Sequence, residues 1–297
     1  MKYLAVLGRQ PLISLAELES LFKKVQPIAP NLATFESSKK PDINRLGGSL
    51  KLAEFLETTP LDFLQNQPEG KITLGLSDYS PRATARATGA EALKLKKILV
   101  RHNRSVRVVP NANAVLSTAT SHNNHLGEKP GKVELIKFGK DYFVSIGTQN
   151  ITAYAKRDQA RPARDAKVGM LPPKLAQILI NLCGDLSQNS RLLDPFCGTG
   201  VVLQEAWLMG YRPYGTDLSE RMVEYSKKNL KWLAAKPSSV PSDETPLNSP
   251  KSSKDILLYF DGSTFCQVEF KNSQVRQKAQ AQKKIAKIHN LLHMDSY

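Results

Sequence analysis

The chain of 297 residues is 41% hydrophobic and 23% charged, a composition that excludes a wholly disordered or fibrous protein and allows two ordinary domains. Its 42 lysine and arginine residues outnumber 27 aspartate and glutamate residues and give a formal net charge of +15. This excess favours a polyanionic partner, first of all a nucleic acid, although a basic enzyme without such a partner would carry the same charge.

No apolar run approaches the roughly 20 residues that a membrane-spanning helix needs, so we expect no membrane partner and a location in the cytoplasm. The three cysteines are odd in number and lack C-x-x-C spacing: Cys183, Cys197 and Cys266. Their pattern predicts neither a disulfide framework nor a metal site.

Residues 1–150 predict an α+β region in which strands and helices alternate. A capping box that starts at Ser14 is expected to open the first helix, and Gly139 with Lys140 is expected to form the turn of a hairpin. The predicted strands span residues 3–8, 72–76, 104–109, 133–138 and 142–146, and further helices are predicted over 46–56 and 84–100.

Residues 151–169 are expected to form a basic linker, because residues 154–167 hold five basic and two acidic residues and little apolar surface. A helix is then predicted to start at Pro172 and Pro173 and to end at a cap on Gly184. A second domain should therefore begin near residue 170.

Residues 170–233 predict the first part of a Rossmann-like domain, because strand, glycine loop, helix, strand and helix follow one another as in a parallel sheet. The strands are expected at 192–193 and 211–216, and the helices at 201–209 and from Ser219 to about residue 233. Residues 234–254 predict a Ser/Pro-rich loop. Residues 255–297 predict a divergent segment with strands at 256–260 and 266–270 and a basic helix at 273–292.

The glycine loop holds the sharpest motif of the chain, Asp-Pro-Phe-Cys-Gly-Thr-Gly over residues 194–200. It lies where a parallel strand ends, and glycines there let a ligand approach the backbone. Asp217 ends the next strand, 19 residues after Gly198. That offset is typical of an acidic residue that binds ribose hydroxyls.

Three classes of nucleotide-like ligand could use such a loop. A dinucleotide fingerprint requires a small residue where Leu203 stands, and Asp194 would face the pyrophosphate. A P-loop requires a lysine that this loop lacks. An adenosyl sulfonium is cationic and tolerates an acidic residue, so the motif favours S-adenosylmethionine.

The two motifs, 194–200 and Gly-Thr-Asp-Leu-Ser-Glu-Arg-Met over 215–222, resemble those of Rossmann-fold amino-methyltransferases. Residues 157–165 and 169–177 resemble the linker and domain entrance of THUMP-containing tRNA guanine N2-methyltransferases of the guanine-10 type. Residues 1–150 resemble that family's ferredoxin-like plus THUMP part, at Gly47-Gly48 and over 103–110. The implied fold class is α/β: an N-terminal α+β part followed by a Rossmann-like methyltransferase domain that is incomplete.

The resemblance implies a methyltransferase with S-adenosyl-L-methionine as cofactor and tRNA or another structured RNA as partner. The candidate cofactor-binding residues are Asp194, Pro195, Phe196, Gly198, Gly200 and Asp217. The candidate RNA-binding residues are Arg104, Arg107, Arg157, Arg161 and Arg164. The last three could instead pair with the two aspartates of a solvated linker.

One expected motif is absent. Amino-methyltransferases of this kind carry Asp/Asn-Pro-Pro-Tyr/Phe, which accepts hydrogen bonds from the target amino group and stacks on the flipped base. The only Pro-Pro pair, Pro172-Pro173, stands between leucine and lysine. No catalytic residue is therefore assigned, and we expect a chain that is truncated, altered after about residue 234, or degenerate. An RNA-binding protein with a non-catalytic methyltransferase remnant and a DNA amino-methyltransferase stay as alternatives.

Overall fold

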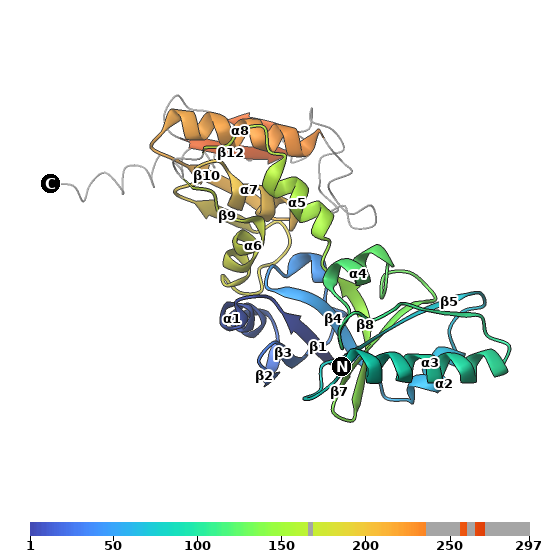
Figure 1. The fold of residues 1–297 in the computed structure, drawn as a ribbon. Coiled ribbons are helices and arrows are strands. Elements are labelled where there is room, and N and C mark those ends of the chain that lie inside the picture. The colour runs from blue at the N-terminus through green and yellow to red at the C-terminus, as the bar shows by residue number, and fades with distance from the viewer. Residues whose placement is uncertain (166–168, 236–255, 260–264, 271–297) are drawn as a thin grey trace. The chain divides into compact units, whose positions relative to one another are not determined.

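The computed structural model describes residues 1–165, 169–235, 256–259 and 265–270 (Figure 1). The chain divides into two compact units. The first contains Met1–Arg161 and Asp165–Gln188, and the second contains Pro162–Arg164 and the chain from Asn189 onward. No helix within the described ranges is both long and apolar enough to cross a bilayer.

The first unit is built on an eight-stranded mixed sheet. Its order is β2-β3-β1-β4-β8-β7-β5-β6, parallel where β5 pairs with β6 and β7 and antiparallel elsewhere. The bounds are β1 (Lys2–Leu7), β2 (Lys23–Ala29), β3 (Leu32–Glu36), β4 (Ser49–Phe55), β5 (Ile72–Asp78), β6 (Val106–Val108), β7 (Lys132–Phe138) and β8 (Asp141–Thr148).

The helices of the first unit pack on this sheet or on one another. They are α1 (Pro11–Leu21), the 3-10 helix η1 (Ile43–Arg45), α2 (Pro60–Gln65), α3 (Ala85–Arg101), α4 (Thr118–Asn123), α5 (Ile151–Gln159) and α6 (Pro173–Asn181). Leu18 of α1 is buried with Tyr3 and Phe35 in one cluster. Ala92 and Leu99 of α3 are buried in another.

The predictions for β1, β5, β6, α3 and the β7–β8 hairpin are confirmed, and Phe138 pairs with Asp141 across the predicted turn. The predicted helix over 46–56 is wrong, because these residues form β4, which has neighbours on both sides, β1 and β8. Leu52 and Ala53 of β4 are fully buried. Burial in β4 does not follow residue type, because Ser49 and Lys51 are also buried. The apolar residues at 46, 50, 52, 55 and 56 therefore fit a helical stripe as well as a strand.

The capping box at Ser14 is also wrong, since α1 begins earlier, at Pro11. Ser14 lies inside the helix and donates a hydrogen bond from Oγ to the carbonyl oxygen of Gln10 at 3.0 Å. The carboxylate of Glu17 does not bind the N–H of Ser14, the contact that the predicted capping box requires. It accepts the N–H groups of Gly47 at 2.9 Å and Gly48 at 2.8 Å.

Glu17 also connects α1 to α6, because Asn181 of α6 donates to Glu17 Oε1 at 2.8 Å. Residues 151–159, predicted as part of a linker, form α5, in which Tyr154 and Arg157 are buried. The predicted helix after Pro172 is confirmed as α6, and Gly184 beyond it has φ +92°. Both helices belong to the first unit.

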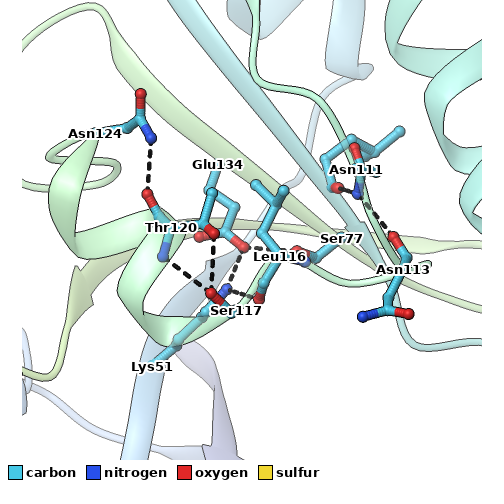
Figure 2. A network of polar contacts seen from close by, with 10 residues as sticks. Lys51, Ser77, Asn111, Asn113, Leu116, Ser117, Thr120, Asn124 and Glu134 are labelled. Atoms are coloured by element: carbon cyan, nitrogen blue, oxygen red, sulfur yellow. Dashed lines mark hydrogen bonds and ion pairs between the residues drawn. The ribbon is translucent and has the colours of Figure 1, made fainter.

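A buried polar network crosses the sheet of the first unit (Figure 2). The ammonium group of Lys51 on β4 donates to Glu134 on β7 and to the carbonyl oxygen of Leu116. Ser77 on β5 donates to the same carboxylate oxygen at 2.6 Å and accepts the N–H of Leu116 at 2.9 Å. Lys51 is 1% exposed and Glu134 is 0% exposed. The network therefore fixes the chain before α4 to the middle of the sheet.

The second unit contains a four-stranded sheet of order β11-β12-β10-β9. Its elements are β9 (Arg191–Asp194), α7 (Val201–Leu208), β10 (Arg212–Thr216), α8 (Glu220–Ala234), β11 (Ile256–Tyr259) and β12 (Phe265–Phe270). The predicted parallel pairing is confirmed for β9 and β10, whereas β12 runs antiparallel to β10. The predicted basic helix at 273–292 and most of the Ser/Pro-rich loop lie outside the described residues.

Candidate cofactor-binding site

The candidate site lies where β9 and β10 end. Asp194 is the last residue of β9 and pairs with Gly215 of β10, so the loop 195–200 and Asp217 follow adjacent parallel strands. Carboxyl ends of parallel strands meet at one edge of a sheet, where ligands bind in open α/β folds. The structure thus brings together Asp194, the two loop glycines and Asp217, as their spacing predicted.

Asp217 holds the loop through its backbone. Its Oδ2 accepts the N–H of Gly198 at 2.9 Å, and its Oδ1 accepts the N–H of Ser219 at 2.9 Å. Thr216 donates from Oγ1 to the carbonyl oxygen of Pro195 at 2.7 Å, and Cys197 donates its N–H to the carbonyl oxygen of Thr216 at 2.8 Å. The end of β10 therefore fixes the loop after β9 at three points.

Asp194 adds a second carboxylate to this edge. Burial raises the pKa of its carboxyl, and the charge of Asp217 raises it further, while the N–H of Phe196, which donates to Oδ1 at 3.1 Å, lowers it. The site therefore concentrates negative charge. Beside it the ring of Phe196 is 80% exposed.

Both loop glycines occupy the left-handed region, with φ +50° at Gly198 and +80° at Gly200. A Cβ on Gly198 would meet nothing within 4 Å, whereas one on Gly200 would lie 2.8 Å from Oγ of Ser226 on α8. Only glycine allows this close approach of the loop to α8. The loop is therefore packed on its inner side and open on its outer side.

Two residues of α8 that the sequence reasoning missed hold the inner side. Ser226 donates from Oγ to the carbonyl oxygen of Gly198 at 2.8 Å, and Asn229 donates from Nδ2 to that of Thr199 at 2.9 Å. Both side chains are fully buried. Their signal was available, because each is a polar residue on the apolar face that Val223, Leu230 and Leu233 define.

The five candidate arginines lie in different surroundings. Arg104 donates to the carbonyl oxygens of Gln67 and Pro68, both at 2.8 Å. Arg157 is buried against the ring of Tyr154 at 4.5 Å, and Arg161 is buried and pairs with Asp158 at 3.4 Å. Arg107 and Arg164 are exposed. Arg104, Arg157 and Arg161 thus make contacts within the protein, and the RNA-binding role of all five arginines stays a prediction.

Arg107 lines an open groove of about 570 Å³ between α3 and β6. Lys71 and Lys96 line the same groove, together with the apolar side chain of Leu93. Three cations around one groove attract an anionic ligand.

Residues 161–284 match the family described as the RMKL-like methyltransferase domain. The matched segment is less than half of the chain, and it includes the loop, Asp217 and both polar residues of α8.

The particular relatives are tRNA methyltransferases of archaea. A stretch of 89 residues is 47% identical to the tRNA (guanine(10)-N2)-dimethyltransferase of Methanothermobacter thermautotrophicus and covers 29% of this chain and 26% of that protein. A stretch of 155 residues is 26% identical to the protein of the same name from Methanocaldococcus jannaschii and covers 52% of this chain and 44% of that protein. These stretches of the chain are thus similar to those proteins, as the motifs indicated, and the matches span less than half of the proteins' lengths.

Among solved structures, a "possible methylase" from Clostridium difficile 630 aligns over 78% of this chain and 72% of its own, at 13% identity and a TM-score of 0.34. The ferredoxin-like and THUMP assignment of the first unit stays a prediction.

Proposed function

We propose that this chain is an S-adenosylmethionine-dependent RNA methyltransferase that acts on the exocyclic N2 of a guanine in tRNA. The observation that carries the proposal is the glycine loop after β9, edged by the carboxylates of Asp194 and Asp217. The relatedness to tRNA (guanine(10)-N2)-dimethyltransferases supports tRNA and guanine as targets. A cytoplasmic location is part of the same proposal.

The loop fits an adenosyl sulfonium better than a phosphate. Residues 194–200 contain no lysine or arginine, and two carboxylates at this edge favour a cation over an anion. Each oxygen of Asp217 accepts one backbone N–H and can accept a further hydrogen bond, as a ribose hydroxyl requires. The exposed ring of Phe196 offers an aromatic face for stacking.

The cofactor, when bound, supplies an electrophilic methyl group on its sulfonium. The chain's own contribution is to hold the loop and to bring the guanine amino group into line with that methyl group. Arg107 and the lysines of the groove beside β6 support RNA binding by the first unit. We assign no residue to accept the amino proton.

A second candidate function is favoured by one observation. The sequence lacks the Asp/Asn-Pro-Pro-Tyr/Phe motif that would contact the target base. The chain would then bind RNA and cofactor without transferring a methyl group.

Calorimetric titration of the full chain with S-adenosylmethionine, and separately with unmodified tRNA, tests both candidates. We expect both ligands to bind, and methyl transfer from labelled cofactor to tRNA then separates enzyme from remnant. A chain that binds tRNA but neither S-adenosylmethionine nor S-adenosylhomocysteine would contradict the proposal.

Asp217→Asn is the sharpest variant for this test. It turns one of the two acceptor oxygens into a donor that faces a backbone N–H, so cofactor affinity should fall about tenfold, the cost of roughly one charged hydrogen bond. Glu220→Gln is the matched control, because it removes the same charge from an exposed side chain three residues further on. Equal affinities of the two variants would show that the loop is misassigned.

A further inference from the structure

Three residues between α5 and α6 belong to the second unit although the chain on both sides of them belongs to the first. They are Pro162–Arg164, and the chain then returns to the first unit until Gln188 and enters the second unit again at Asn189. Ala163, the middle residue of the three, is 4% exposed. Something in the second unit must therefore hold the backbone of Ala163, because buried peptide groups need hydrogen-bond partners.

The side-chain amide of Asn229 on α8 is that partner. Its Oδ1 accepts the N–H of Ala163 at 3.0 Å, and its Nδ2 donates to the carbonyl oxygen of Ala163 at 2.9 Å. The same Nδ2 donates to the carbonyl oxygen of Thr199 in the glycine loop at 2.9 Å. One amide thus pairs with both peptide groups of Ala163 and with the loop.

This arrangement uses the whole donor capacity of the amide. An asparagine amide has two N–H donors, and here the two donate to the carbonyl oxygens of Ala163 and Thr199. Its oxygen, Oδ1, accepts the N–H of Ala163. The reversed amide would set its oxygen against two carbonyl oxygens, so the orientation is defined. Asn229 is 0% exposed and Thr199 is 6% exposed, which leaves water no easy way to replace the side chain.

The contact to Thr199 fixes the least constrained part of the loop. Thr199 stands between Gly198 and Gly200, whose φ angles are both positive, and a peptide group flanked by glycines has few steric barriers to reorientation. Ser226 fixes the carbonyl group of Gly198, and Asn229 fixes the next one. Asn229 thereby links the loop to Pro162–Arg164.

We propose that Asn229 is a positioning residue that clamps Pro162–Arg164 to the glycine loop and so gives the loop the shape that binds cofactor. This inference rests on the proposed function, because it concerns the same cofactor site. Its consequence is that the cofactor-binding unit requires residues 162–164, far ahead in sequence of β9. The family match, which begins at residue 161, agrees with that boundary.

Asn229→Ala in the full chain tests the clamp by two measurements. Hydrogen exchange of the ligand-free protein should become faster at Ala163, because its N–H loses the acceptor Oδ1. It should also become faster over 198–200, because the carbonyl group of Thr199 is no longer held and the loop opens more often. Affinity for S-adenosylhomocysteine in calorimetry should fall about tenfold, since the loop must be ordered on binding. Affinity for tRNA, which the first unit supports, should stay unchanged.

Three further variants separate positioning from a loss of fold. Asn229→Asp keeps an acceptor for Ala163 but loses both donors, so exchange should quicken in the loop and not at Ala163. Ser226→Ala should loosen the loop and leave Ala163 protected. Lys228→Ala, an exposed neighbour on α8, should change neither quantity, and thermal unfolding of each variant shows whether the second unit is folded.

The outcomes distinguish this inference from the function on which it rests. Normal S-adenosylhomocysteine affinity of folded Asn229→Ala, or unchanged exchange at Ala163, would overturn the clamp and leave the proposed function intact. A wild-type chain that binds no S-adenosylhomocysteine would overturn the proposed function, and the positioning role with it.

Discussion

The two units bury polar groups in different ways. In the first unit, Lys51 and Glu134 pair side chain to side chain across a sheet, and both are completely enclosed. In the second unit, Asp217 and Asn229 bind backbone groups of a loop, and the outer edge of that loop stays open. The first arrangement fixes a fold, whereas the second fixes the shape of a surface that a ligand can use.

The difference also concerns charge. The buried pair of the first unit is internally neutral, and its remaining hydrogen bonds go to Ser77 and Leu116. The carboxylates of Asp194 and Asp217 face no cation in the loop 194–200. Two carboxylates beside a loop that itself carries no cation are typical of a site for a cationic ligand.

Lys51→Met should break the first unit with the largest effect of any change considered. Glu134 would keep a buried charge without a cation, and removing one partner of a buried pair costs about 3–5 kcal/mol. Urea unfolding monitored by far-ultraviolet circular dichroism should show this loss of stability. Affinity for S-adenosylhomocysteine should be unaffected, because the second unit does not depend on the pair.

The double variant Lys51→Met/Glu134→Leu is the control, because it removes both charges and leaves none unpaired. It should be more stable than the single variant. A double variant as unstable as Lys51→Met would contradict the view that the unpaired carboxylate causes the loss.

Gly200→Ala should act on the second unit in the same way that Lys51→Met acts on the first. The left-handed conformation and the approach of the new Cβ to Ser226 together should cost about 2–4 kcal/mol. Thermal unfolding and calorimetry with S-adenosylhomocysteine should both report the change.

Gly198→Ala is the matched comparison within the same loop. It carries only the conformational strain, about 1–2 kcal/mol, because a Cβ there meets nothing within 4 Å. If the two alanine variants were equally stable, contact with Ser226 would not limit the loop.

Asp194→Asn should remove a pH dependence of S-adenosylmethionine affinity that we expect from the carboxylates of the second unit. Burial and the charge of Asp217 raise the pKa of Asp194 above its ordinary value of 3.8. As the pH falls through that raised pKa, the carboxylate takes up a proton and its attraction for a cationic ligand is lost. S-adenosylmethionine affinity should therefore decline on acidification, by roughly 1 kcal/mol or about fivefold.

S-adenosylhomocysteine, which lacks the sulfonium charge, should show a weaker pH dependence, and Asp194→Asn should remove the difference between the two ligands. Calorimetric titrations at several pH values give both profiles. Parallel profiles for the two ligands in the wild type would place the sulfonium away from Asp194.

Lys24→Ala should have the smallest effect. The pair between Lys24 and Glu36 has the short distance of 2.9 Å, yet the side chains are 70% and 48% exposed. Exposed pairs contribute at most about 1 kcal/mol. Urea unfolding should show a loss below that value, and a loss as large as that of Lys51→Met would mean that burial does not decide what a salt bridge contributes here.

The sequence predicted the second unit better than the first for a physical reason. The strands, glycine loop and helix around residues 191–216 follow one another locally, and each end carries its own signal, such as Gly200 or Asp217. The strand β4 depends on partners distant in sequence, and β2 and β3 were not predicted at all. β2 carries Pro27 and several polar residues, so it lacks the alternation that marks a strand.

The buried residues outside the motifs were missed for a related reason. Lysine and arginine are seldom buried, so Arg157 was assigned to a basic linker and no pattern singled out Lys51. Burial of Lys51 depends on Glu134 from another strand, and that of Arg157 on the ring of Tyr154. Asn229 depends on Ala163, 66 residues earlier. Such pairs become visible only when the fold brings them together.

The brief passage of Pro162–Arg164 through the second unit has a consequence for the order of events during synthesis. The first unit is complete once residue 188 has left the ribosome, whereas Ala163 must wait for Asn229. Domains generally fold from the N-terminus onward as they are made. The peptide groups of Ala163 therefore remain solvated on a finished first unit until α8 emerges, and that late pairing connects Pro162–Arg164 to the rest of the second unit.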